Sequence, residues 1–269
     1  MPRQPAFNIP AVTLGAMALL ALIHGLREYA LTDRQDLETL ATFAFTPARF
    51  TLLFDPDGVA EALEGFAQTQ AALFFLGDGE PQWWTLVTYS FLHADWTHLG
   101  LNALWLAAFG TPVARRFGSL RFILFCLVTT LAGALGHYAL HAYDFLPMIG
   151  ASGAVSGLTG ACIRFVFQSH GPLAGGYAAT GDEAYRLPAL SLGGVLRDSR
   201  AFTFLAFWLA LNVLFGVLSP TLGLSQGPVA WEAHMGGFLA GLLIFGLLDP
   251  VTPSSRDHEA GEGGFRLRR

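Results

Sequence analysis

The chain contains six long, uncharged apolar segments, which are separated by more polar connections. They occupy residues 9–26, 96–114, 122–143, 145–163, 201–219 and 228–248, and only Glu232 interrupts the last. A helix needs about 20 mainly apolar residues to cross a bilayer, because each residue adds about 1.5 Å. The pattern therefore predicts an all-α membrane protein with six transmembrane helices, at about residues 9–28, 94–114, 120–143, 150–168, 201–219 and 228–248.

The remaining segments complete the expected organisation. Residues 1–8 are predicted to be a short cytoplasmic N-terminus, and the polar residues 250–269 a disordered cytoplasmic tail, so that the folded domain covers residues 9–249. The first apolar run is longer than that of a signal peptide and starts at Pro10, which favours an uncleaved span.

The first external connection, residues 28–95, is long and of mixed character. It carries eleven acidic residues, yet it also contains apolar runs at 50–54 and 71–76 that are too short to span a bilayer. We interpret it as a membrane-associated loop that lies in the interface, partly as short amphipathic helices, rather than as a separate extramembrane domain. Trp83, Trp84 and Tyr89 resemble the aromatic residues that mark a membrane interface.

Composition and charge fix the class and the orientation. The chain is 53% hydrophobic and 13% charged, whereas soluble domains carry about 25% charged residues. All fifteen basic residues are arginine, and with the N-terminus inside, twelve lie on that side against two or three outside. The positive-inside rule then places both termini in the cytoplasm, and we expect a multi-pass protein of a bacterial inner (plasma) membrane. No nucleic-acid partner is expected, and the oligomeric state is not predicted.

Three polar groups lie within the apolar segments. Burying a polar side chain in a bilayer costs free energy, so each group indicates a structural or functional role. They are Ser152 near the start of the fourth segment, His98 with Asn102 one turn later in the second, and His234 in the sixth. Helices two, four and six all enter the membrane from the outside in this topology. Each carries its polar group within about two turns of that entry, so the four side chains are expected at one depth just below the outer surface.

Small residues allow two of these helices to approach closely. Gly153 and Gly157 recur at a spacing of four in the fourth segment, and Gly237 and Gly241 do so in the sixth. A serine beside a histidine is an activated nucleophile, because the imidazole takes the hydroxyl proton. Hydrogen bonds from a nearby histidine, an asparagine and the serine N–H stabilise a developing oxyanion. Glu232 lies half a turn from the histidine on another face, so the pattern favours a dyad over a triad.

The sequence resembles the rhomboid family of intramembrane serine proteases. The matching motifs are Gly150-Ala151-Ser152-Gly153, His98-x-x-x-Asn102 and Ala233-His234-x-Gly236-Gly237, in the same order and topology across the six helices. The resemblance implies that Ser152 is the nucleophile, that His234 is the general base, and that His98 and Asn102 stabilise the oxyanion. It also implies a six-helix rhomboid bundle that needs no cofactor or metal and cleaves single-pass transmembrane proteins near their outer boundary.

Two positions depart from the pattern of many relatives. A Trp-Arg pair in the first external loop is replaced by Trp84-Thr85, and a tyrosine that stacks on the histidine is replaced by Ser156. These changes concern the rigidity of the loop and the orientation of the histidine, so the imidazole must be held by another group.

Other assignments remain open at this stage. His137 and His141 have a spacing that suits a metal ion, but no acid or cysteine joins them in the motif, so we interpret them as interfacial histidines. Cys126 and Cys162 are interpreted as buried small hydrophobic residues. A catalytically inactive rhomboid-like binding or quality-control protein and a transporter are the alternative functions; the transporter is disfavoured because intramembrane acids and broken helices are lacking.

The fifth segment is expected to act as the substrate gate. It is rich in bulky aromatic residues, Phe204, Phe207, Trp208 and Phe215, and is followed by a Gly- and Pro-containing connection at 219–228 that could lift as a cap.

Overall fold

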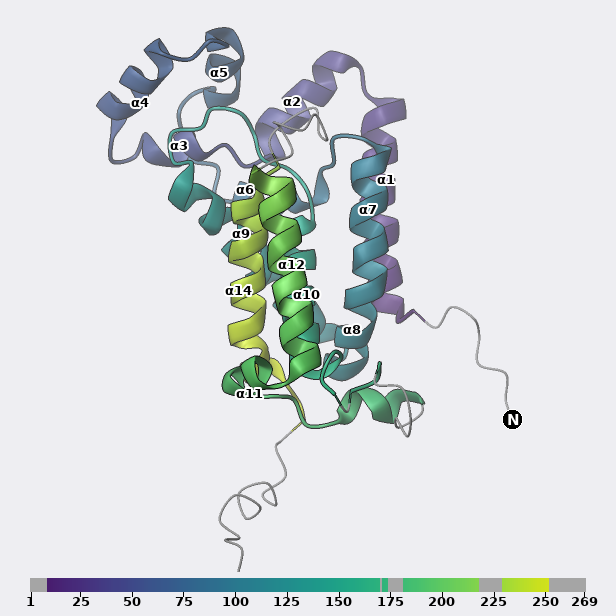
Figure 1. The fold of residues 1–269 in the computed structure, drawn as a ribbon. Helices are drawn as coiled ribbons and strands as arrows, with labels where there is room; N and C mark the ends of the chain where they lie inside the picture. Colours follow the sequence, from purple (N-terminus) through teal and green to yellow (C-terminus); the bar gives the residue numbers. More distant parts are fainter. Residues whose placement is uncertain (1–8, 170, 174–180, 218–228, 252–269) are drawn as a thin grey trace, which may run out of the picture.

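The computed structural model describes residues 9–169, 171–173, 181–217 and 229–251, and within them every element is a helix apart from one β-bridge between Phe45 and Met148 (Figure 1). The predicted cytoplasmic N-terminus, most of the predicted tail and the predicted cap at 219–228 lie outside the described residues. The helices of the bundle are α1 (Ala11–Ala30), α7 (Trp96–Trp105), η2 (Leu106–Gly110), α8 (Thr111–Phe117), α9 (Ser119–Leu140), α10 (Ser152–Phe165), α12 (Ser199–Val217) and α14 (Trp231–Leu248).

Three of these helices, α9, α10 and α14, pack with their backbones in contact at the centre of the bundle (Figure 1). A Cβ added at Gly237 would lie 2.7 Å from the carbonyl carbon of Gly153, and one added at Gly241 would lie 2.6 Å from the Cα of Gly157. Such distances leave no room for any side chain. The two glycine faces of the sequence therefore meet as predicted, which brings the first turns of α10 and α14 together.

The remaining long helices stand around this centre. α1 packs against α7, η2 and α8, which follow one another from residue 96 to residue 117. Within the described residues, three helices are long and apolar enough to cross a membrane, namely α1, α9 and α14, and a shorter apolar helix spans Ser199–Leu214. The count of six spans remains a prediction.

The loop region (residues 31–95) forms short helices at one end of the bundle, which we call the loop end (Figure 1). These helices are α2 (Asp33–Phe43), α3 (Pro47–Thr51), α4 (Pro56–Glu64), α5 (Thr69–Leu76), α6 (Thr85–Thr88) and η1 (Tyr89–Phe91). Arg49 is buried among them, and its guanidinium donates to the carbonyl oxygens of Glu80 at 2.9 Å and Phe75 at 3.3 Å and to the Asp78 carboxylate at 2.7 Å. An arginine from another part of the loop thus provides the rigidity that Thr85 put in question.

Two features of the loop region bear on its relation to a bilayer. Trp83 and Trp84 are exposed, at 60% and 49%, together with other large apolar side chains, as the predicted interfacial position requires. Tyr89 does not share that position, because it is 1% exposed and its hydroxyl donates to the carbonyl oxygen of Thr130 in α9 at 2.9 Å. The interpretation of Tyr89 as an interfacial aromatic is therefore wrong: it is a core residue that joins the loop to the bundle.

An ion pair closes the opposite end of the bundle. Arg116 of α8 donates two hydrogen bonds of 2.8 Å to the carboxylate of Asp249, which follows α14. The two side chains are 0% and 8% exposed, and the guanidinium also donates to the carbonyl oxygens of Tyr185 and Leu187. This pair ties the end of α14 to α8 and to the connection between α10 and α12.

Candidate functional site

Ser152 begins α10 at the loop end, directly after a turn that only glycine can make easily. Gly150 has φ +120°, and its N–H donates to the carbonyl oxygen of Tyr89 at 3.0 Å. A Cβ added at Gly150 would lie 2.8 Å from Nε2 of His98 and 3.9 Å from Oγ of Ser152. The imidazole of His98 and the hydroxyl of Ser152 therefore converge on the same glycine. The N–H of Ser152 is among the first N–H groups of α10, which have no partner within a helix.

His98 and Asn102 lie on α7 and are fixed by local hydrogen bonds. Asp95 caps the helix by accepting from the N–H of His98 at 2.8 Å, and Nδ1 of His98 accepts from the N–H of Ala94 at 3.4 Å. With Nδ1 as the acceptor, the ring proton is on Nε2, the atom that faces Gly150. Asn102 is buried and uses one of its two amide hydrogens on the carbonyl oxygen of His98 at 3.0 Å. In the part of the chain that the structure describes, the second amide hydrogen has no partner and can donate to a ligand.

His234 lies in the first turn of α14, and its partner comes from a helix to which sequence reasoning gave no site residue. Nδ1 of His234 lies 3.0 Å from Oδ1 of Asn212 in α12. The Asn212 amide nitrogen donates to the carbonyl oxygen of Trp208 at 2.9 Å, which fixes Oδ1 as the atom that faces the histidine. Since a carbonyl oxygen only accepts, Nδ1 of His234 carries the proton, and Nε2 is left with a free lone pair. This is the tautomer that a general base requires.

Ser152 and His234 are placed on adjoining backbones. Gly153, which follows the serine, and Ala233, which precedes the histidine, are close enough for a Cβ on Gly153 to lie 3.6 Å from the carbonyl oxygen of Ala233. In the described part of the chain no hydrogen bond joins the two side chains.

A second group of polar side chains lies at the same end of the bundle. His137 and His141 of the third predicted span meet Glu232, whose carboxylate oxygens lie 2.9 Å from Nε2 of His141 and 3.6 Å from Nδ1 of His137. The sequence interpretation rested on the absence of an acid near these histidines, and the structure supplies one from α14. The two cysteines are free; Cys162 is buried and Cys126 half-buried.

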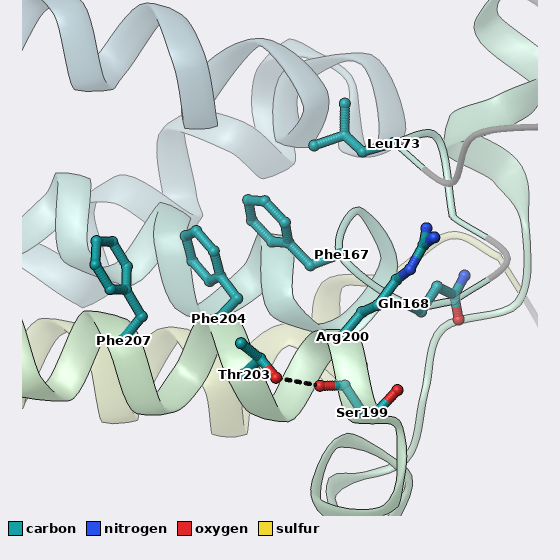
Figure 2. A pocket seen from close by; sticks show the side chains of 8 residues that line it. All are labelled: Phe167, Gln168, Leu173, Ser199, Arg200, Thr203, Phe204 and Phe207. Atoms are coloured by element: carbon teal, nitrogen blue, oxygen red, sulfur yellow. Dashed lines mark hydrogen bonds between the residues drawn. The ribbon is translucent and has the colours of Figure 1, made fainter.

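A groove is present far from these groups, where α12 begins beside the end of α10 (Figure 2). Its aromatic wall is formed by Phe167, Phe204 and Phe207, and its polar rim includes Gln168, Ser199 and Arg200. Within the groove Phe204 of α12 stacks on Phe167, two residues after α10, at a ring-centroid distance of 3.7 Å.

The sequence comparisons assign most of the chain to one family. The family model of the Rhomboid domain matches residues 80–249, which contain every predicted site residue. The chain belongs to the rhomboid family. With its apolar helices it is an integral membrane protein.

Individual relatives match parts of this rhomboid chain. It is 36% identical over 103 residues to the Rhomboid protease GluP of Bacillus subtilis, which is 38% of this chain and 19% of that protein. It is 35% identical over 91 residues to the Putative rhomboid protease YdcA of the same organism, 34% of this chain and 45% of that protein. RHOMBOID-like protein 1 of Arabidopsis thaliana is 24% identical over 237 residues, 88% of this chain and 51% of that protein. The chain thus spans about half or less of the length of these relatives.

Two contacts of these histidines, that of Asn212 with His234 and that of Glu232 with His141, were not predicted from the sequence, although a signal for each was present. Asn212 is a polar residue in an apolar, aromatic segment, and the rule that drew attention to His98 and His234 applies to it equally. Glu232 is the one acid in the last apolar segment, at the depth where His137 and His141 are expected. Both pairings were missed because the partners are distant in the sequence.

Proposed function

We propose that this rhomboid is an intramembrane serine endopeptidase that cleaves single-pass transmembrane proteins near the outer membrane boundary. Ser152 attacks the scissile carbonyl, and His234 takes the hydroxyl proton and later delivers it to the leaving amine. The Nε2 proton of His98, the free amide hydrogen of Asn102 and the N–H of Ser152 stabilise the oxyanion. Water then hydrolyses the acyl-enzyme with His234 again as the base.

The observation that supports this function best is the convergence of Ser152 and His98 on Gly150 at the start of α10. A nucleophile, a ring N–H and the N-terminus of a helix meet there, which is the set of groups that acyl transfer needs. The hydrogen bond from His234 to Asn212 supports the assignment of the base, because it leaves Nε2 unprotonated. Asn212 also answers the question raised by Ser156, since it orients the histidine in the absence of a stacked tyrosine.

The topology is part of the proposal. Six spans with both termini in the cytoplasm place the loop end, and with it Ser152, on the outer side of a bacterial inner membrane. The distribution of arginines supports this orientation. Water then reaches the site from the outside.

Two serine variants test the nucleophile. Ser156 lies one turn after Ser152 and is buried, so it is about 6 Å further from the outer water. Ser152→Ala should abolish both cleavage of a transmembrane substrate and labelling by a fluorophosphonate probe, whereas Ser156→Ala should retain most of both. Labelling of the Ser152→Ala protein would show that the nucleophile lies elsewhere, and an unlabelled wild-type protein would favour the inactive binding protein.

The oxyanion groups have their own test. Replacing His98 or Asn102 by Ala should lower kcat by about 10²–10³, with a smaller effect on KM. A loss of thermal stability as large as that of a core substitution, with kcat unchanged in the remaining folded protein, would instead assign them to helix packing.

The gate is proposed at α12. Besides the hydrogen bond of Asn212, it makes two aromatic contacts: Phe204 stacks on Phe167, which follows α10, and Trp208 stacks on Phe238 of α14 at a centroid distance of 4.0 Å. Phe207 is 58% exposed and contributes less. Replacing Phe204 and Trp208 by smaller residues should therefore raise cleavage of a membrane-embedded substrate more than replacing Phe207, and a water-soluble substrate should respond little.

A crosslink provides the decisive measurement for the gate. The rings of Phe204 in α12 and Phe109 in η2 lie 6.1 Å apart, so cysteines at these two positions, joined by a bifunctional thiol reagent after Cys126 and Cys162 have been replaced, would tie α12 to η2. Undiminished cleavage of a transmembrane substrate with this crosslink fully formed would rule the gate out.

A further inference from the structure

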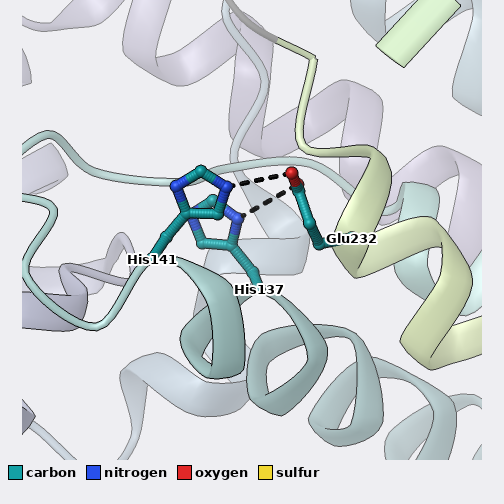
Figure 3. A group of neighbouring side chains, drawn as sticks. All are labelled: His137, His141 and Glu232. Carbon is teal, nitrogen blue, oxygen red and sulfur yellow. Dashed lines mark hydrogen bonds and ion pairs between the residues drawn. The ribbon is translucent and has the colours of Figure 1, made fainter. Parts of the chain in front are cut away.

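The cluster of His137, His141 and Glu232 has the composition and spacing of a metal-binding site (Figure 3). One potential ligand atom from each side chain lies within 4.8 Å of the other two. A tetrahedral zinc ion with bonds of about 2.1 Å needs ligand atoms about 3.4 Å apart. Two of the three separations bracket that value: Nε2 of His141 lies 2.9 Å from one carboxylate oxygen of Glu232, and Nδ1 of His137 lies 3.6 Å from the other.

One buried member of the cluster, His137, is poorly satisfied by the protein alone. The His137 side chain is 10% exposed, and its Nδ1 has no hydrogen-bond partner although it faces the carboxylate of Glu232 (Figure 3). The Glu232 side chain is 7% exposed and has no arginine among its contacts in the described part of the chain. An unpaired imidazole nitrogen beside a buried carboxylate is costly unless a cation joins them.

His141 carries a second carboxylate on its other ring nitrogen. Its Nδ1 lies 3.0 Å from the carboxylate of Asp144, and its Nε2 lies 2.9 Å from that of Glu232. A proton on Nδ1 directs the lone pair of Nε2 at Glu232, so two acceptors would face each other without a cation between them. A second proton on His141 would satisfy this pair but would leave the buried Nδ1 of His137 without a hydrogen-bond partner. A metal ion satisfies all three side chains, and Asp144 then orients the ligand histidine as an outer carboxylate commonly does.

We propose that His137, His141 and Glu232 bind one divalent zinc-like metal ion at the loop end of the bundle. Two imidazoles and a carboxylate form a common ligand set for zinc, with a fourth position left for water. The His141 side chain is 35% exposed, which gives the ion access from the aqueous side. The bound ion joins the end of α9 to the first turn of α14, two residues before His234, and thereby fixes the helix turn that carries the proposed base.

The experiment measures zinc binding and not activity, so it stands apart from the proposed protease function. The full chain is purified in detergent without a polyhistidine tag, stripped with a chelator, and titrated with zinc against a chromophoric zinc indicator. We expect one equivalent to bind, with an X-ray absorption spectrum of two imidazoles and oxygen ligands, and to raise the thermal unfolding temperature.

The variants separate the cluster from the other histidines. His141→Ala and Glu232→Gln should each lower zinc affinity at least 100-fold, and Asp144→Asn should lower it about 10- to 100-fold. His234→Ala serves as the matched control in the same helix turn and should bind zinc as wild type does. Because His141 is partly exposed, its variant tests the site even where a change at a buried member impairs folding. Absence of bound zinc in the wild-type protein, or unchanged affinity in His141→Ala, would overturn the proposal.

Discussion

Gly241→Ala should separate the two helices that carry the proposed nucleophile and base. A methyl group at Gly241 would lie 2.6 Å from the Cα of Gly157, whereas ordinary contact begins at 3.4 Å. The shortfall of about 0.8 Å faces backbone and not a flexible side chain, so α10 and α14 must move apart. Overpacking of this kind costs about 1–3 kcal/mol of unfolding free energy.

The same helix offers a matched control. Gly246 is exposed, and a Cβ added there would meet nothing within 4 Å. Gly246→Ala should therefore raise the free energy of unfolding only through helix propensity, by at most about 1 kcal/mol. In Gly241→Ala the same gain is reduced by the cost of overpacking. The difference in unfolding free energy between the two variants isolates the cost of the contact, about 1–3 kcal/mol.

Both quantities can be measured in mixed micelles. Unfolding is followed by circular dichroism during titration with a denaturing detergent, and kcat/KM is measured with a fluorogenic transmembrane peptide. Since a misplacement of about 1 Å between reacting groups costs about 10²-fold, Gly241→Ala should lose roughly tenfold or more in kcat/KM. If Gly241→Ala were as stable and as active as Gly246→Ala, the backbone contact would not position the site.

Three further outcomes follow from single contacts. Asn212→Ala should lower kcat about tenfold, the worth of one hydrogen bond to the base, whereas Asn212→Asp keeps an acceptor and should lose less; equal losses would refute the orienting role. Asp249→Asn leaves the guanidinium of Arg116 buried without its counter-charge and should cost about 3–5 kcal/mol in detergent unfolding, and a cost below about 1 kcal/mol would contradict this. The hydrogen bond from the Tyr143 hydroxyl lowers the pKa of Asp55 in the folded protein. The ionised Asp55 therefore stabilises the fold fully above the pKa that Asp55 has in the unfolded chain, and this stabilisation is lost as the pH falls through its lower pKa in the folded protein. Hydrogen exchange in α4 should accelerate over that acid range in wild type and lose this dependence in Asp55→Asn.

The features predicted correctly from periodicity and spacing are those that residues close together in the sequence determine. The approach of α10 to α14 was evident from glycines four residues apart, and Gly237 and Gly241 do meet Gly153 and Gly157 in the structure. Two glycines four residues apart lie on the same face of any α-helix, whatever the helix packs against.

The features that sequence reasoning missed depend on pairing between distant segments. Asn212 has a role only because α12 lies beside α14, and Glu232 meets His141 only because α9 ends beside the first turn of α14. Tyr89 has the character of an interfacial aromatic, but Gly133 and Gly153 leave room beside them for its hydroxyl, which donates to Thr130. Hydropathy along one segment contains none of this information, since it depends on which neighbour the segment packs against.

The hydrogen bond between Asn212 and His234 links the proposed gate to the timing of the reaction. Its length is 3.0 Å, so a displacement of α12 by about 0.5 Å along that direction stretches it to the limit of a hydrogen bond. A gap wide enough to admit a substrate helix would be many times larger. While such a gap is open, the imidazole is free to turn and to exchange its ring proton between nitrogens. An open gate and an oriented base then exclude each other, so a substrate would be cut only after α12 has closed again, and a protein that merely passes the opening would leave intact.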